Sequence, residues 1–183
     1  DNSVVAMAAV FDVTGVDAIV DWVEVELRQG ADNSNTPLTA RVSAFLQRDG
    51  DIVGIDGSSS IEFEVPVGDY FIAIKHRNHL GVLTNNAMSL SNSTANLADF
   101  TANASFVKGS TLATAALTNG RLALVGGDSD ENGQIVPADG TIVGTVIGTS
   151  ASYSSNDVNL DGQFLPSDIN LLISVNIGKG QQF

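Results

Sequence analysis

The chain has 183 residues, and its 8 lysines and arginines against 21 aspartates and glutamates give a formal net charge of -13. Nucleic acids and anionic membranes bind basic surfaces, so this balance excludes both as expected partners and favours divalent cations. Hydrophobic residues make up 43% of the chain, which is enough to bury a core. No apolar run reaches the roughly 18 residues that a membrane span needs. The absence of cysteine excludes disulfides, thiolate metal sites and cysteine nucleophiles.

Residues 4–13 are almost continuously apolar. This predicts a central strand, or an edge strand that a neighbouring copy receives into its sheet. The second alternative makes the protein a self-assembling subunit of an extracellular fibre, built by N-terminal strand exchange. The chain begins at Asp1 without a charged stretch followed by an apolar one, as expected of a cytosolic protein, a mature secreted protein or a piece of a longer chain.

Apolar and polar residues alternate along several stretches before residue 107, which predicts strands with one face on a core. Short turns containing Gly and Asp separate these stretches, at Asp49–Gly50 for example, and no helical pattern intervenes. We therefore predict a mainly β protein with an antiparallel β-sandwich, Ig-like or jelly-roll-like, over residues 1–125. Its inward-facing sets are Val23, Val25 and Leu27; Leu38, Ala40, Val42, Ala44 and Leu46; Ile61, Phe63 and Val65; and Tyr70, Ile72 and Ile74.

Residues 84–106 are rich in Asn, Ser, Thr and Ala. Their composition allows either two more polar strands or a loose excursion from the sheet. The sequence leaves this choice open.

Three segments of the predicted sandwich form one recognisable pattern. They are DWVEVELR at 21–28, LQRDGDIV at 46–53, and the stretch from Gly68 to KHRNHLGV at 75–82. This pattern resembles a module found near the ends of large secreted surface proteins of Bacteroidetes-type bacteria, often labelled adhesin- or hemagglutinin-like. The resemblance covers roughly residues 19–84 and implies an extracellular, non-catalytic setting without a known ligand.

An internal repeat occupies the region after residue 125, which we expect to form a separate unit over residues 126–183. DSDENGQIVPAD at 128–139 aligns without gaps to DVNLDGQFLPSD at 157–168. Both match the calcium-loop template, with acidic or amide side chains at positions 1, 3 and 5, Gly at 6 and a carboxylate at 12. The repeat therefore predicts two calcium ions, and crowded carboxylates predict a loose segment without them.

Each loop supplies the oxygen ligands that calcium prefers. Position 7 is expected to contribute a backbone carbonyl, and water is expected to fill position 9, where the side chains are Val136 and Leu165. The predicted ligands are Asp128, Asp130, Asn132, Gln134 and Asp139 in the first loop, and Asp157, Asn159, Asp161, Gln163 and Asp168 in the second.

The duplicated loops, each closed by Asp rather than Glu and each followed by one apolar helical stretch, resemble the dockerin family. The helical stretches contain Ile142, Val143, Val146 and Ile147, and then Ile169, Leu172, Ile173 and Asn176. A cohesin partner is doubtful, because Pro137-Ala138 and Pro166-Ser167 stand where cohesin-binding dockerins have hydroxyl-rich pairs. We expect the unit to dock instead on its own sandwich, on other copies or on neighbouring surface domains.

No residue is predicted to be catalytic. His76 and His79 are expected to face opposite ways at a strand end and to bond nearby loops, and the pairs Glu24 with Glu26 and Glu62 with Glu64 are expected on solvated strand faces. Trp22 and Tyr70 leave one further alternative, a sugar-binding module of a larger secreted enzyme. The main expectation is a non-enzymatic, extracellular structural or adhesion module that calcium rigidifies.

Overall fold

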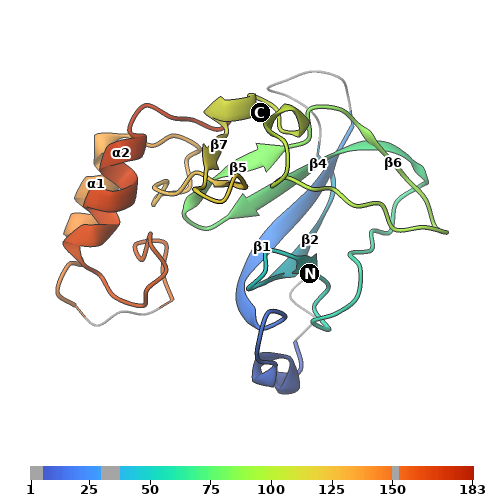
Figure 1. The fold of residues 1–183 in the computed structure, drawn as a ribbon, viewed down its shortest axis with the longest axis horizontal. Coiled ribbons are helices and arrows are strands. Elements are labelled where there is room, and N and C mark those ends of the chain that lie inside the picture. The colour runs from blue at the N-terminus through green and yellow to red at the C-terminus, as the bar shows by residue number, and fades with distance from the viewer. Residues whose placement is uncertain (1–5, 30–37, 150–152) are drawn as a thin grey trace.

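The computed structural model describes residues 6–29, 38–149 and 153–183. One antiparallel sheet of six strands forms the larger body, with strand order β3-β2-β1-β4-β5 and β6 pairing with β4 (Figure 1). A second sheet contains β7 and β8. The strands are β1 (Ile19–Arg28), β2 (Leu38–Gln47), β3 (Ile52–Val53), β4 (Gly68–His76), β5 (His79–Leu83), β6 (Met88–Leu90), β7 (Thr114–Ala116) and β8 (Leu122–Leu124).

The main core lies on one face of the six-stranded sheet. Val23, Val25 and Leu27 of β1 are buried there beside Tyr70 and Ile72 of β4, as the alternation predicts. Chain segments 61–65 and 98–113 cover this face from the other side, and side chains such as Phe63, Phe100 and Val107 complete the core. The prediction of a mainly β, antiparallel sandwich is confirmed.

The N-terminal apolar stretch is not a strand in its described part. Residues 8–12 form a 3-10 helix, η1 (Ala8–Asp12), and residues 1–5 lie outside the described residues. Val10 is buried against Gly57, whereas Phe11 packs edge-on against Phe45 of β2. A run of apolar residues indicates that side chains are buried but does not specify the backbone conformation. Here a short helix buries one of these side chains. The strand on which the fibre hypothesis depends is therefore absent from residues 6–13.

The predicted strand around Ile61, Phe63 and Val65 is also wrong. All three side chains contact the core, and their neighbours are exposed, but the backbone there pairs with no strand. The Val65 N–H donates to the Phe63 carbonyl two residues earlier, and Pro66 has no N–H to donate. Alternation thus identified the buried face correctly without a partner strand. Residues 84–106 contain only the short β6 and the 3-10 helix η2 (Ala104–Phe106). A further 3-10 helix, η3 (Ser110–Leu112), follows.

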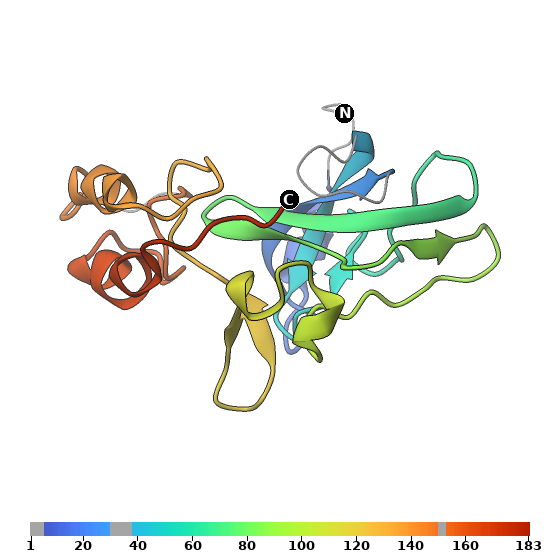
Figure 2. The same ribbon diagram turned by 90° about the horizontal axis from the view of Figure 1, so that it is seen from above.

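Two helices form the outer end of residues 126–183 and lie side by side in both ribbon views (Figure 2). The first is α1 (Pro137–Gly144); the second combines the π-helical turn η4 (Asp168–Ile173) with α2 (Ser174–Asn176). A Cβ at Gly140 would lie 3.5 Å from Ile169 Cγ2, which is an ordinary van der Waals contact, so the two helices pack closely at this point. The first helix ends before Val146 and Ile147, earlier than the apolar pattern indicates.

A second apolar core joins this end of the molecule to the sheet. Leu80 of β5 is completely buried among side chains of the C-terminal region. The last residues return across the sheet, where Gln181 and Phe183 lie against Gly81 and the Phe183 ring lies 5.0 Å beneath the Arg28 guanidinium (Figure 2). The second core consists of Leu80, Val125, Ile135, Val143, Val158 and Ile173.

Among the residues placed by the structure, no helix is both long and apolar enough to cross a membrane.

Candidate metal centre

Three carboxylates of the first loop converge at the junction between β8 and α1. One oxygen from each of Asp128, Asp130 and Asp139 lies within 4.8 Å of the others. Asp128 and Asp139 are buried, whereas Asp130 is exposed. Burial, together with the negative charges of Asp139 and Asp130, raises the pKa of the Asp128 carboxyl to about 6, although backbone N–H groups donate to it. Such a cluster favours a bound cation, which offsets the repulsion between its members.

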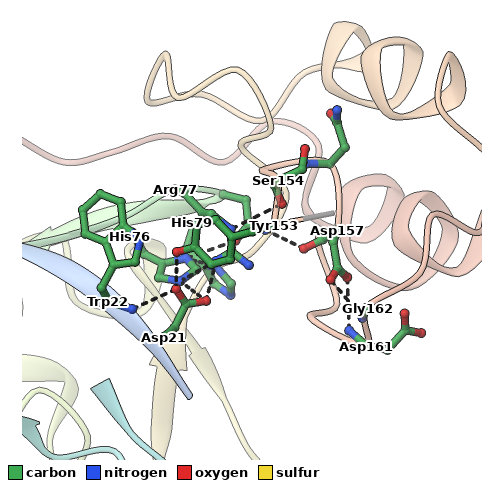
Figure 3. A network of polar contacts seen from close by, with 12 residues as sticks. Asp21, Trp22, His76, Arg77, His79, Tyr153, Ser154, Asp157, Asp161 and Gly162 are labelled. Carbon is green, nitrogen blue, oxygen red and sulfur yellow. Dashed lines mark hydrogen bonds and ion pairs between the residues drawn. The ribbon is translucent and has the colours of Figure 1, made fainter. Parts of the chain in front are cut away.

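The aspartate at position 1 has the same role in both loops. Asp128 accepts the N–H groups of Asn132 at 3.0 Å and Gly133 at 2.9 Å. Asp157 accepts those of Asp161 at 3.1 Å and Gly162 at 2.9 Å (Figure 3). Each carboxylate therefore holds the backbone of positions 5 and 6 close to position 1 of its loop.

The aspartate at position 12 closes each loop in an equally repeated way. Asp139 accepts the N–H groups of Ser129 and Val136, both at 2.8–2.9 Å. Asp168 accepts those of Val158 at 2.8 Å and Leu165 at 2.9 Å. These donors are positions 2 and 9 in both cases. Asp139 and Asp168 are both completely buried, so each closing carboxylate is locked beneath its loop.

The backbone of the two loops bends at the same places. Gly133 and Gly162 at position 6 have φ values of +83° and +80°, which only glycine adopts readily. Position 4 has a φ of +61° in both loops, although its residues are Glu131 and Leu160. Left-handed backbone at a residue other than glycine is uncommon, so its recurrence shows that one conformation is built twice.

The remaining predicted ligands lie on the outer rim of the loops. Asn132 Nδ2 donates to Asp130 Oδ2 at 2.8 Å, and Asn159 Nδ2 donates to Asp161 Oδ2 at 3.0 Å, so positions 3 and 5 are paired in each loop. Gln134 and Gln163 at position 7 are exposed, and their N–H groups donate to the position-5 side chains.

The two loops differ in how closely their acids gather. Within the described residues, no group of three acidic, histidine or cysteine side chains other than that of the first loop meets the 4.8 Å spacing. The carboxylates of the second loop are therefore more widely spread. Both loops offer oxygen donors alone, which fit a hard cation such as calcium and suit softer metals poorly.

A buried polar network lies on the sandwich side of the second loop (Figure 3). Asp21 of β1 forms an ion pair with Arg77, lies 3.1 Å from His76 Nε2 and accepts the Tyr153 hydroxyl at 2.5 Å. Burial alone would raise the pKa of Asp21, but the hydrogen bonds from His76, Tyr153 and the Trp22 N–H lower it to about 2. The carboxylate is therefore ionised and fully partnered.

His76 and His79 do not face opposite ways, contrary to the expectation from their spacing. Their Nδ1 atoms lie 3.0 Å apart, and both lie within 3.1 Å of Asn78 Oδ1. The register shift between β4 and β5 at this hairpin brings the two rings onto one side. Burial, with the neighbouring His76 and Arg77, lowers the pKa of His79 to about 3, so this imidazole is neutral at pH 7.

Two other expectations about side chains on the strands need correction. Glu26 does not lie on a solvated face, because it is 2% exposed and forms ion pairs with Arg28 and Lys75. Tyr70 is buried in the core with its hydroxyl on the Pro66 carbonyl, so it cannot stack on a sugar ring, although Trp22 is 44% exposed.

Sequence reasoning missed Asn78 and Leu80, which connect the sandwich to the loops. The only signal for them was the 75–82 stretch, whose resemblance to a known module marked it as a pattern without assigning it a role.

Comparisons with known proteins place the chain in no family. No family model matches the sequence, and no curated protein matches it. The chain is similar to one chain in the crystal structure of a cohesin–X-dockerin complex. That complex is an N-terminal interface mutant of a type II cohesin–X-dockerin complex from Acetivibrio cellulolyticus. The two chains share 16% sequence identity, with a TM-score of 0.48 over 98% of this chain and 92% of that chain.

Proposed function

We propose that the protein is a non-catalytic, extracellular calcium-binding module in which two calcium ions hold residues 126–183 in a fixed geometry beside a β-sandwich of residues 1–125. The observation that carries this proposal is the repeated hydrogen bonding of positions 1 and 12 in the two loops. An accidental pair of Asp-Gly turns has no reason to repeat these bonds and the left-handed backbone at positions 4 and 6.

The proposed ligands are the side chains at positions 1, 3, 5 and 12, with the backbone carbonyls of Gln134 and Gln163. Calcium takes six to eight oxygen ligands, so water is expected to supply the rest. A dication would neutralise the crowded carboxylates of each loop and lower the free energy of the folded state. The ions would thus do structural work, which suits a rigid module for surface assembly or adhesion with other copies or neighbouring domains.

Thermal unfolding of the full chain, in excess chelator and in millimolar calcium, tests the proposal. A ligand at a thousandfold excess over its Kd stabilises the folded state by about 4 kcal/mol per site, so the melting temperature should rise by several degrees or more. Magnesium at the same concentration should give a smaller rise, because it demands a tighter octahedral shell.

Two variants serve as controls for this measurement. Asp130→Ala combined with Asp161→Ala removes one exposed ligand from each loop and should abolish most of the calcium effect. Asp51→Ala removes an exposed aspartate from a sandwich turn and should leave the effect intact. A melting curve that calcium does not change would defeat the proposal.

A further inference from the structure

The hairpin turn between β4 and β5 lies directly against the beginnings of both loops. Asn78, at the tip of this turn, is completely buried. Its backbone carbonyl accepts the N–H of Gly127, which precedes the first loop, at 2.9 Å. Its side-chain Nδ2 donates to the backbone carbonyl of Asp157, the first residue of the second loop, at 2.7 Å. One sandwich residue thus bonds the first residue of the second loop and the residue immediately before the first loop.

The amide of Asn78 has little freedom to turn. Its Oδ1 atom lies 2.7 Å from His79 Nδ1 and 3.1 Å from His76 Nδ1, so the oxygen is held on the imidazole side. The nitrogen is therefore directed toward Asp157, and both ends of the amide are satisfied. A buried amide with all its partners in place is a rigid connection, because rotating it would strand polar groups away from water.

Contacts beside Asn78 also fix the residues that lead into the second loop. Arg77 Nε donates to the Ser154 carbonyl at 3.3 Å, and its guanidinium lies 4.1 Å above the Tyr153 ring (Figure 3). The Tyr153 hydroxyl donates to Asp21 on β1. Residues 153–154 are thus attached to the sandwich by three contacts before the second loop begins.

We propose that Asn78 is a positioning residue that sets the second loop for calcium and couples calcium affinity there to the sandwich. This inference rests on the proposed function. Asn78 fixes the backbone of Asp157, and the Asp157 carboxylate in turn organises positions 5 and 6 of its loop. A loop whose first ligand is already placed pays less entropy when it binds a cation. By linkage, calcium in the second loop must stabilise the docked turn to the same extent.

Calcium titration calorimetry on the full chain tests the proposal. Asp130→Ala leaves the second loop as the measured site, and Asp161→Ala leaves the first. Asn78→Ala added to each variant should weaken calcium binding about tenfold at the second loop and less than twofold at the first, since the bond to Gly127 uses only backbone. Equal weakening at both loops, or none at either, would overturn the proposal.

A matched control and a milder variant guard against a general loss of fold. Asn85→Ala removes an exposed asparagine that bonds the Ser105 carbonyl within the sandwich, and should leave both affinities unchanged. Tyr153→Phe removes one hydroxyl, and should weaken the second loop in the same direction but less. If Asn85→Ala weakens the second loop as much as Asn78→Ala does, the proposal is wrong.

Hydrogen exchange in excess chelator separates this inference from the proposed function. The amides of Asp161 and Gly162, which donate to the Asp157 carboxylate, should exchange faster in Asn78→Ala than in the unmodified chain, whereas those of Asn132 and Gly133 should not. Unchanged exchange at Asp161 and Gly162 would count against the positioning role whether or not calcium binds. Absence of calcium binding to the unmodified chain would instead overturn the proposed function.

Discussion

Asp21 shows how a buried charge can be stable at the edge of a sandwich. Its side chain is almost fully buried, and removing a carboxylate from water is costly. The ion pair with Arg77 offsets part of this cost. Hydrogen bonds from His76, Tyr153 and the Trp22 N–H lower the pKa of Asp21 to about 2. The ionised carboxylate therefore connects β1, the β4–β5 turn and the chain that leads into the second loop.

The lowered pKa of Asp21 predicts a definite pH dependence. Because the folded pKa of about 2 lies below the ordinary value of 3.8, ionised Asp21 stabilises the fold above about pH 4, and this contribution disappears as the pH falls toward 2. Asp21→Asn should lower the free energy of unfolding at pH 7 by about 2 kcal/mol. Urea unfolding between pH 7 and pH 2.5, at constant ionic strength, measures the difference.

The difference in free energy of unfolding between Asp21→Asn and the unmodified chain should decrease steadily as the pH falls below 4. Asp12→Asn, in the exposed end of η1, is the matched control and should have little effect at any pH. A deficit in Asp21→Asn that stays the same at pH 7 and pH 2.5 would show that the charge is not what stabilises this network.

At the scale of elements, the two loops are one structure built twice with exchanged side chains. The first loop has Asp at position 3 and Asn at 5, and the second has Asn at 3 and Asp at 5. Asp130 is exposed, yet its charge contributes to raising the pKa of Asp128, so it opposes the folded state in the absence of a cation. The same charge should favour calcium.

Asp130→Asn should therefore have opposite effects with and without calcium. In excess chelator its melting temperature should equal or exceed that of the unmodified chain, because repulsion in the first loop falls. Its calcium affinity at the first loop should fall about tenfold, since ligand charge tunes such sites. Asp161→Asn is the matched change in the second loop. Scanning calorimetry and calcium titration measure both quantities, and a large loss of stability in chelator would contradict this explanation.

The loops could be predicted from the sequence because their pattern is local. Twelve consecutive residues contain the ligand positions and the glycine that bends the backbone. The strands around Val25 and Ile72 were predictable for the same reason, since alternation over a few residues reports a buried face.

Features that depend on distant partners could not be predicted in this way. Alternation at Ile61, Phe63 and Val65 gave the buried side chains but could not show that no strand pairs with them. The contact between Asn78 and Asp157 joins residues 79 positions apart, and nothing near either residue specifies the other. The meeting of His76 with His79 depends on a register shift that only the folded hairpin defines.

At the scale of the whole molecule, charge and connectivity are arranged around the loops. Seven of the 21 acidic residues lie in residues 126–183, where Lys179 is the only basic residue. The sandwich holds this acidic region through the Asn78 turn, through Leu80 and through the C-terminal residues, which bond the first loop at Gly133 before they reach the sheet. With two bound dications, the sandwich and residues 126–183 would form a single rigid unit.

Anomalous diffraction from crystals soaked in millimolar calcium would show whether cations occupy the two loops. One anomalous peak is expected within each loop, between the position-1 and position-12 aspartates, and variants of either loop should lose the corresponding peak together with its calcium affinity in solution. Electron density for water alone among those aspartates, with no anomalous signal in either loop, would contradict this prediction.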